Sequence, residues 1–396
     1  MTELQPQDET SAAEMVRAAA AERTPLEIVA GGSRRGLGRP VQAARTLSAL
    51  GLTGVTLYEP GALTLVARAG TPLREVEAAL AAEGQRLAFE PPDHRPLLGS
   101  EGAEPTLGGV VATAASGPRR IQVGACRDFL LGARFVNGAG ELVKAGGRVM
   151  KNVTGYDLAR LMAGAYGTLG LLTELSFKVL PTPETATTLA LRGLDDATAV
   201  RALSAALGSP YDVTGAAHLP AGIADPAAMT LIRLEGFADS VAARAGKLSA
   251  DLAGFGAVER IDDAAAVAER WASIRDARPF AGRPGAVWRV SVKPSDGPKA
   301  AAALPGAQAF YDWGGGLVWL LLPEAPESAD PAQAQAVRAA AAAVGGRATL
   351  VRASEPLRAA LPVFPEDDPV RARLSAELKR RFDPAGVFNP GRMRPV

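Results

Sequence analysis

Residues 106–120 read TLGGVVATAASGPRR, and every side chain before Gly117 in this stretch is small or aliphatic. The adjacent glycines, Gly108 and Gly109, let a helix or loop approach a flat ligand closely, and the arginine pair that ends the stretch supplies further hydrogen-bond donors. The same composition would suit a helix packed tightly against a sheet. The stretch therefore predicts a short buried helix over residues 108–115, with either a cofactor or a sheet against it.

A second glycine cluster, GGSRRGLGR at residues 31–39, follows the predicted strand LEIVA. Its backbone N–H groups can surround an anion closely, and Arg34, Arg35 and Arg39 can bond to phosphate oxygens. The dinucleotide fingerprint G-x-G-x-x-G fails because Val41 stands where the third glycine belongs, and no G-K-[ST] follows to make a P-loop. The loop is a candidate phosphate cradle, and a solvated surface loop is the alternative.

The third cluster, GAYGTLGLLTE at residues 164–174, turns the chain sharply before a predicted buried strand, LLTELSFKVLP. Three loops of small residues now fall within one predicted domain. Together they indicate one extended ligand with phosphates and a planar ring.

The composition gives backbone groups, rather than titratable side chains, the main part in binding. Glycine accounts for 43 of 396 residues, against 2 histidines and 1 cysteine. These counts exclude an internal disulfide, a cysteine-held iron-sulfur cluster and a zinc site built from cysteines within this chain, and we predict no metal site. A formal charge of +1 provides no field to attract nucleic acid or an anionic membrane surface.

The order of predicted elements indicates an α+β fold in three parts. Residues 1–183 contain the glycine loops. In residues 184–352 the order β-α-β-β-α-β, typical of a ferredoxin-like unit, occurs twice, and we expect the two units to form one sheet with helices on one face. Residues 353–396 contain a predicted helix over 369–381, followed by FDPAGVFNPGRM. The apolar residues of that segment predict that it returns to the first part.

Four segments, taken in order, resemble the FAD-binding oxidoreductases of the vanillyl-alcohol oxidase and p-cresol methylhydroxylase type: PGALTLVARAGTPL, EPTLGGVVATAASGPRRIQVGACRDFLLGARFVNGAGE, KNVTGYDLARLMAGAYGTLGLLTE and FDPAGVFNPGRM. The resemblance covers residues 25–185 and 370–394. It implies a two-part FAD-binding domain, an inserted ferredoxin-like α+β cap domain and a C-terminal segment that returns to the FAD domain.

The resemblance also implies which residues contact FAD. They comprise the pyrophosphate cradle, two stretches that line the cofactor, a segment along it and one asparagine near the C-terminus: Gly31, Gly32, Ser33, Arg34, Arg35, Gly36, Thr106, Leu107, Gly108, Gly109, Ala115, Ser116, Gly117, Arg119, Leu169, Gly170, Leu171 and Asn389.

Within this family, the sequence is most similar to the FAD-binding subunits of bacterial glycolate oxidases. The resemblance implies that this chain forms a complex with a catalytic FAD subunit and an iron-sulfur subunit. It also implies glycolate or another small 2-hydroxy acid as substrate and glyoxylate as product. We expect a cytoplasmic protein, because a single cysteine fits a reducing compartment. No apolar run approaches the roughly 18 residues that span a bilayer, so we expect at most a peripheral place on the inner membrane through the complex.

Two departures from the family pattern concern the cofactor and the site. Ser33 stands where some relatives attach FAD through a histidine, and Cys126 lies outside the position of cysteinyl attachment, so noncovalent FAD is expected. Relatives with metal-assisted chemistry tend to read S-E-G-T-L-G where this chain has Tyr166 in place of the glutamate.

Few side chains could act on a 2-hydroxy acid, whose oxidation needs a base for the hydroxyl and a cation for the carboxylate. Arg289 is a weak candidate for the carboxylate ligand, and packing within the cap sheet is its alternative. His94 lies on a predicted loop, where solvent exposure is the expectation. The catalytic residues stay unassigned. A self-sufficient FAD-linked 2-hydroxyacid dehydrogenase and a non-catalytic structural or electron-relay subunit therefore remain as alternatives.

Overall fold

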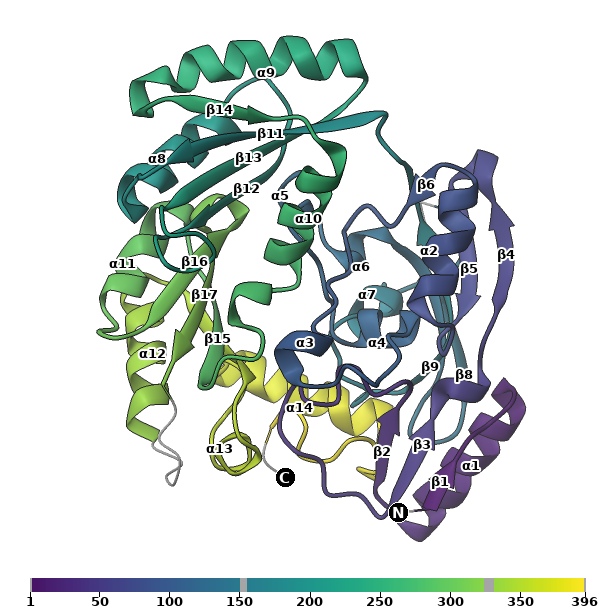
Figure 1. Cartoon of the computed structure of the whole chain (residues 1–396). Helices are drawn as coiled ribbons and strands as arrows, with labels where there is room; N and C mark the ends of the chain where they lie inside the picture. Colours follow the sequence, from purple (N-terminus) through teal and green to yellow (C-terminus); the bar gives the residue numbers. More distant parts are fainter. Residues whose placement is uncertain (1, 150–154, 324–330, 395–396) are drawn as a thin grey trace.

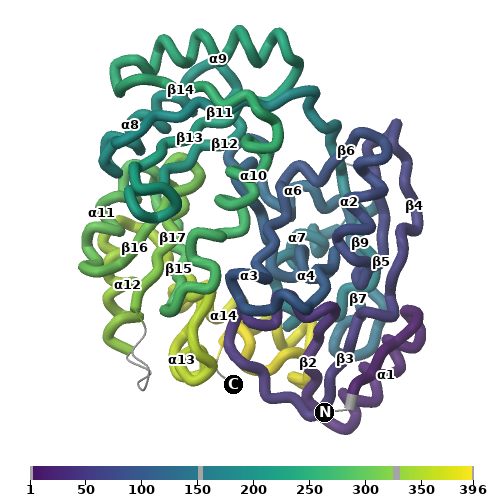
Figure 2. The backbone as a smooth tube through the Cα atoms, viewed as in Figure 1, coloured from purple at the N-terminus to yellow at the C-terminus, as the bar shows by residue number. Residues whose placement is uncertain are grey.

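Two large sheets in opposite halves of the molecule organise the fold (Figure 1). The computed structural model describes residues 2–149, 155–323 and 331–394. The backbone trace passes from one half to the other and then back (Figure 2). Among the described residues, no helix is both long and apolar enough to span a bilayer.

The N-terminal part is a small parallel sheet of order β1-β3-β2 with one helix packed on it. The helix begins where Asp8 accepts a hydrogen bond from the backbone of Ser11, and it buries Ala12 and Val16. Its elements are β1 (Thr2–Leu4), α1 (Glu9–Glu22), β2 (Leu26–Val29) and β3 (Arg45–Ser48).

A five-stranded antiparallel sheet of order β4-β5-β9-β7-β8 follows. Its strands are β4 (Val55–Glu59), β5 (Thr64–Arg68), β7 (Leu130–Val136), β8 (Leu142–Gly146) and β9 (Leu171–Lys178). A two-stranded ladder, β6 (Gln85–Arg86) with β10 (Leu180–Pro181), lies beside it. The helices of this part are α2 (Leu73–Ala82), α3 (Arg95–Leu98), α4 (Leu107–Ala112), α5 (Arg120–Val123), α6 (Cys126–Phe129) and α7 (Leu158–Met162).

Pro72 occupies the N-cap position of α2, and the Thr71 hydroxyl before it donates to Arg68 O and accepts from Gly54 N. One local prediction in this part needs correction. The predicted helix over residues 108–115 is shorter, because α4 ends at Ala112. The chain beyond α4 is thereby free to run along a cavity.

The cap is one eight-stranded sheet of order β14-β11-β13-β12-β16-β17-β15-β18. Each half has the strand order of a ferredoxin-like unit, as the repeated order of elements predicts, and the halves meet where His218 of β12 pairs with Tyr311 of β16. The strands are β11 (Thr185–Arg192), β12 (Val213–Leu219), β13 (Met229–Gly236), β14 (Val258–Ile261), β15 (Ala286–Ser291), β16 (Gln308–Asp312), β17 (Leu317–Leu322) and β18 (Arg347–Arg352).

Helices cover both faces of the cap sheet, so the prediction of helices on one face is incomplete. One face packs on α8 (Asp196–Leu207), α9 (Ala238–Leu252), α11 (Gly297–Ala302) and α12 (Pro331–Ala343). The other face packs on α10 (Ala264–Arg275) and on Leu37 and Leu97 of the part that carries the two N-terminal sheets, which is called the FAD part below after the cofactor that the resemblance implies. Strand β17 serves both cores through its alternation, with Trp319 on the FAD side and Leu320 on the opposite side.

The C-terminal segment returns to the N-terminal part, as expected. It contains α13 (Glu355–Ala360) and α14 (Pro369–Phe382), which Figure 1 shows in yellow. Beyond α14, the chain joins β2: Leu26 N donates to Val387 O at 2.8 Å, and Asn389 N donates to Leu26 O at 3.0 Å. Phe388 is buried in the same core as Leu26. The last residues thus form part of the wall around the glycine loops.

Candidate FAD site

The three glycine clusters meet around one cleft in the FAD part. The cleft contains about 850 Å³ of empty space, part of it open to solvent. It is lined by members of the predicted cofactor-binding set from all three clusters and from the C-terminus: Gly31, Gly32, Ser33, Arg34, Arg35, Thr106, Gly108, Gly109, Gly170, Leu171 and Asn389.

Two of these glycines are required by close backbone approach. A Cβ on Gly31 would lie 1.9 Å from the carbonyl oxygen of Glu104, whose N–H donates to Gly31 O at 2.9 Å. A Cβ on Gly108 would lie 2.7 Å from Ala69 O. Both glycines therefore hold the loops together and leave the cleft side free of side chains.

Asn389 connects the C-terminal segment to two walls of the cleft. Its Oδ1 accepts from Ile28 N at 2.8 Å, and its Nδ2 donates to Tyr166 O at 2.8 Å. Arg392 donates to the carbonyl oxygens of Arg35 and Leu37 in the first glycine loop. The cleft is thus built from segments more than 200 residues apart in the sequence.

Arg34 shows that the cleft suits a ligand with acceptor atoms. Its Nη2 donates to Pro92 O at 2.6 Å, but its Nε and Nη1 are buried without a partner among the described residues. Burial lowers the pKa of its guanidinium. A buried cation with unpaired N–H groups is costly unless a ligand completes its bonds. The glycine-lined walls and this cation fit a cofactor with phosphate oxygens and a flat ring.

A second cavity, with about 660 Å³ of empty space, continues from the cleft and lies between the FAD part and the cap. Arg34, Leu37, Thr113 and Tyr166 line both. Ala115, Ser116 and Gly117, which the resemblance assigns to FAD contact, line this second cavity. Its cap wall includes Arg289, Asp312, Leu317, Trp319 and Thr349.

Arg289 and His94 both face the second cavity. The Arg289 guanidinium lies over the ring of Trp313, 4.9 Å from its centre, and no hydrogen bond or ion pair involves it among the described residues. Burial, followed by the charge of Arg120, lowers its pKa to about 10. The expectation that His94 is solvent exposed is wrong: both ring nitrogens are buried and unpartnered among the described residues, and burial lowers the pKa of His94 to about 3.

Four residues of the predicted set line neither cavity. Leu107 and Leu169 are buried in the core of the FAD part, and Gly36 O accepts from Arg358 of α13. The Arg119 guanidinium forms an ion pair with Glu235 of the cap sheet. Arg119 is therefore placed in the contact between the two parts rather than at the cleft.

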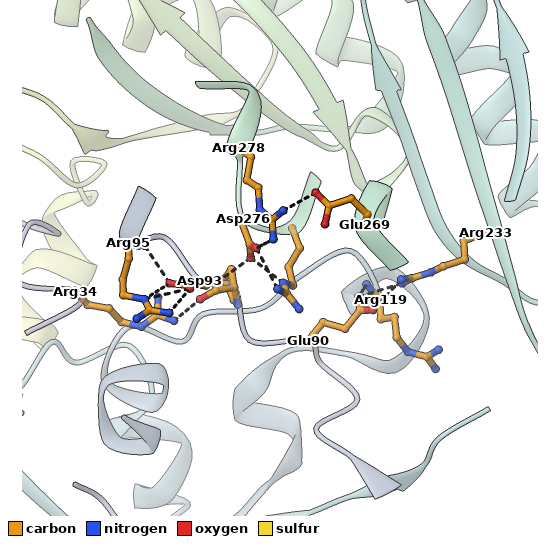
Figure 3. A network of polar contacts seen from close by, with 11 residues as sticks. Arg34, Glu90, Asp93, Arg95, Arg119, Arg233, Glu269, Asp276 and Arg278 are labelled. Carbon is orange, nitrogen blue, oxygen red and sulfur yellow. Dashed lines mark hydrogen bonds and ion pairs between the residues drawn. The ribbon is translucent and has the colours of Figure 1, made fainter. Parts of the chain in front are cut away.

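A network of buried ion pairs joins the cap to the FAD part (Figure 3). Arg233 of β13 donates to both oxygens of Glu90, at 2.8 and 3.0 Å, and Arg119 N donates to Glu90 Oε2 at 2.9 Å. A second group connects Asp276, at the end of α10, to Asp93 N at 2.8 Å. Because Glu90 and Asp93 flank the chain that forms the second cavity, these bonds fix its shape.

The sequence reasoning missed several residues that line the cavities. Arg392 lies in the segment FDPAGVFNPGRM and Tyr166 in the third glycine cluster, so both could have been predicted from motifs already identified. Asp312, in the segment YDWGGG, lines the same cavity as Arg289, and no role was predicted for it from the sequence. Nothing in the local sequence indicates that Phe364 would reach this cavity.

The fold is that of the FAD-binding oxidoreductases of the p-cresol methylhydroxylase type. A family model described as FAD binding domain matches residues 3–146. The solved structure of p-cresol methylhydroxylase with substrate bound superposes with a TM-score of 0.73 over 99% of this chain and 88% of that one, at 14% identity. An alkyldihydroxyacetonephosphate synthase superposes at 0.69, with 17% identity, over 98% of this chain and 76% of its own.

Sequence relatives narrow the family. The glycolate oxidase subunit GlcE of Escherichia coli K12 is 38% identical over 385 residues, which cover 96% of this chain and 95% of that protein. The glycolate oxidase subunit GlcD of Bacillus subtilis is 36% identical over 131 residues, 33% of this chain and 24% of that protein. The chain belongs to the GlcE family of FAD-linked oxidoreductases, and FAD is its cofactor.

Proposed function

We propose that this chain is the FAD-binding subunit of a glycolate oxidase complex, which oxidises glycolate to glyoxylate. One observation carries the proposal: similarity to GlcE continues through the cap and the C-terminal segment, over 96% of the chain. Similarity to GlcD covers only 33%. The cap supplies most of one wall of the second cavity, so this shared part is the one that would set substrate choice.

The complex would contain a catalytic FAD subunit and an iron-sulfur subunit. The names of GlcE and GlcD, as subunits of a glycolate oxidase, support the presence of a second FAD subunit. A separate iron-sulfur subunit is supported by the sequence, since an iron-sulfur cluster needs several thiolates and this chain has 1 cysteine. Electrons would leave through the partners, and any membrane contact would be peripheral and through them.

FAD would bind noncovalently, held by the cleft residues given above. Ser33 lines the cleft but offers no nucleophile of the kind that attaches flavin in some relatives. Cys126 is buried, and burial raises the pKa of its thiol to about 12. Both observations support a cofactor held by contacts alone.

We also propose a division of the chain into an FAD domain (1–183), a cap (184–352) and a C-terminal return (353–396). The last strand before the cap is β10 (Leu180–Pro181), which pairs with β6, and the strands of the cap sheet lie between Thr185 and Arg352. In this division, the buried ion pairs described above are contacts between the cap and the FAD domain.

In the second cavity, Arg289 would bind the carboxylate of the substrate. It projects from β15 toward the FAD part, with Trp288 and Val290 on the opposite face. Its lack of a hydrogen-bonded or ionic partner among the described residues supports this role, since guanidinium and carboxylate form strong paired bonds. A bound flavin supplies the hydride acceptor.

The test is glycolate oxidation by the chain purified alone and together with its GlcD-type and iron-sulfur partners, with flavin content recorded for each. We expect FAD in both samples and dye reduction by glycolate only in the complex. Full activity of the chain alone would establish the self-sufficient dehydrogenase instead. Absence of flavin from the chain in both samples would overturn the proposal.

A further inference from the structure

The second cavity holds one carboxyl group among its described lining residues, that of Asp312. Asp312 ends β16 and lies on the same face of the sheet as Phe310, which packs toward the FAD part. Arg289 projects from this face as well. The carboxyl is thus brought to the cavity that continues from the FAD cleft.

The surroundings of Asp312 leave one of its oxygens free. The residue is 3% exposed, and its Oδ1 accepts from Trp313 N at 2.7 Å. Among the described residues, no other hydrogen bond and no ion pair within 4 Å involves this carboxyl. A buried carboxyl with no counter-ion is costly, and such groups gather at functional sites.

Its proton affinity suits exchange near neutral pH. Burial, with a smaller contribution from Glu90, raises the pKa of Asp312 from 3.8 to about 7, against the lowering effects of the Trp313 N–H bond, Arg233 and Arg289. The other titratable and charged groups that line this cavity are Arg34, His94, Tyr166 and Arg275. His94 has a pKa lowered to about 3, and burial raises the pKa of Tyr166 above its ordinary value. Of these groups, Asp312 is best matched to accept a proton from a hydroxyl.

We propose that Asp312 is the proton acceptor for the hydroxyl of a 2-hydroxy acid, so that this subunit, assembled in the complex, oxidises substrate at its own FAD. The inference rests on the proposed function and assigns the base that the sequence did not reveal. The O–H bond breaks and its proton passes to the free Asp312 oxygen, while the carbon–oxygen bond becomes a carbonyl. The hydride of the adjacent carbon leaves with its electron pair, and a bound flavin is the oxidant that accepts it.

The first test needs no turnover: the FAD-loaded full chain is titrated with oxalate, an unreactive dianion, by calorimetry in buffers of different ionisation enthalpy. At pH 8 Asp312 is mostly ionised, so a dianion placed beside it would draw about one proton per oxalate onto the wild type. Asp312→Asn should bind oxalate with no such uptake, and Asp239→Asn, an exposed carboxyl of α9, should behave as wild type.

The second test is the reduction of flavin by glycolate in the full complex. Asp312→Asn should slow the reduction of this subunit's flavin by roughly 10²–10⁴-fold, the usual contribution of a general base. If glycolate reduces the flavin equally fast in the wild type and in Asp312→Asn, the role of Asp312 is overturned while the proposed function stands. No flavin reduction in the wild-type complex would overturn the proposed function itself. If Asp312→Asn fails to retain FAD, the oxalate titration of the wild type tests the proposal alone. Absence of proton uptake by the wild type at pH 8 would contradict the proposal.

Discussion

Single residues decide whether the cleft can accept FAD at all. Gly31 has the strictest requirement, because a Cβ there would collide with the Glu104 carbonyl at 1.9 Å. Gly31→Ala should push the first glycine loop into the cleft, cost roughly 1–3 kcal/mol of stability by overpacking, and abolish FAD retention. Gly61→Ala is the matched control, since nothing lies within 4 Å of its added Cβ. Flavin absorbance per chain after gel filtration is the measurement, and equal FAD content in the two variants would contradict the placement of the loop.

Arg289 should set substrate affinity more than chemistry. Arg289→Met would remove the proposed partner of the substrate carboxylate, and a lost charged hydrogen bond of about 1.5–3 kcal/mol corresponds to a rise in KM of roughly 10–100-fold. Arg201→Met, on the exposed side of α8, should leave KM unchanged. Steady-state glycolate oxidation by the complex measures this, and a wild-type KM in Arg289→Met would assign Arg289 to packing on Trp313.

At this scale, the sequence predicted the backbone part of the site better than the side-chain part. Glycine requirements are local, so clusters such as Gly108–Gly109 point to close approach without knowledge of the fold. Asp312 and His94 acquire their surroundings from burial between the cap and the FAD part, which no local pattern contains. The wrong expectation of a solvent-exposed His94 has this cause.

Among the elements, the C-terminal return is the one that completes the cleft. Asn389 bridges Ile28 N and Tyr166 O, each at 2.8 Å. Asn389→Asp keeps the first bond but sets a carboxylate oxygen against the Tyr166 carbonyl, so we expect a loss of about 1–3 kcal/mol and weaker FAD binding.

The pH dependence of the stability of Asn389→Asp tests whether the lost bond to Tyr166 O causes the effect. Once protonated, the carboxyl introduced by Asn389→Asp can again donate to Tyr166 O, so the stability difference between this variant and wild type should shrink as pH falls below neutrality. Urea unfolding of both proteins at each pH measures it. A difference that stays constant with pH would contradict the proposed bridge.

Elements with long, periodic or alternating patterns were predicted from sequence, and the short ones were not. The strand β9 and the helix α14 lie where the sequence predicted them. The short parallel strands β1 and β3 were missed, since three or four residues carry too little pattern, and their pairing depends on β2 and on the C-terminal segment.

For the whole molecule, the contact between cap and FAD part is expected to be rigid because charged pairs are buried in it. Arg233→Met would leave Glu90 buried without its cation, at a cost of roughly 3–5 kcal/mol. Arg192→Met removes a half-exposed pair with Glu259 on the outer part of the same sheet and should change stability little. Urea unfolding compares the two variants, and equal midpoints would contradict a structural role for the Glu90 pair.

The pair also determines how stability responds to acid. Burial alone would raise the pKa of Glu90, but Arg233 and the bond from Arg119 N outweigh it and hold the pKa below its ordinary value. A carboxyl with a depressed pKa in the folded state adds stability above its unfolded pKa and loses it as pH falls through the folded value. Arg233→Met should therefore lose less stability on acidification than the wild type does.

Whether this subunit's own flavin accepts electrons from glycolate is tested by the flavin absorbance of the purified complex after anaerobic addition of glycolate, with and without FAD in this chain. We predict that glycolate bleaches the flavin of this subunit in the wild-type complex, and that the bleached amount falls by this subunit's share in Gly31→Ala. Bleaching of the same amount of flavin in both complexes would contradict this claim.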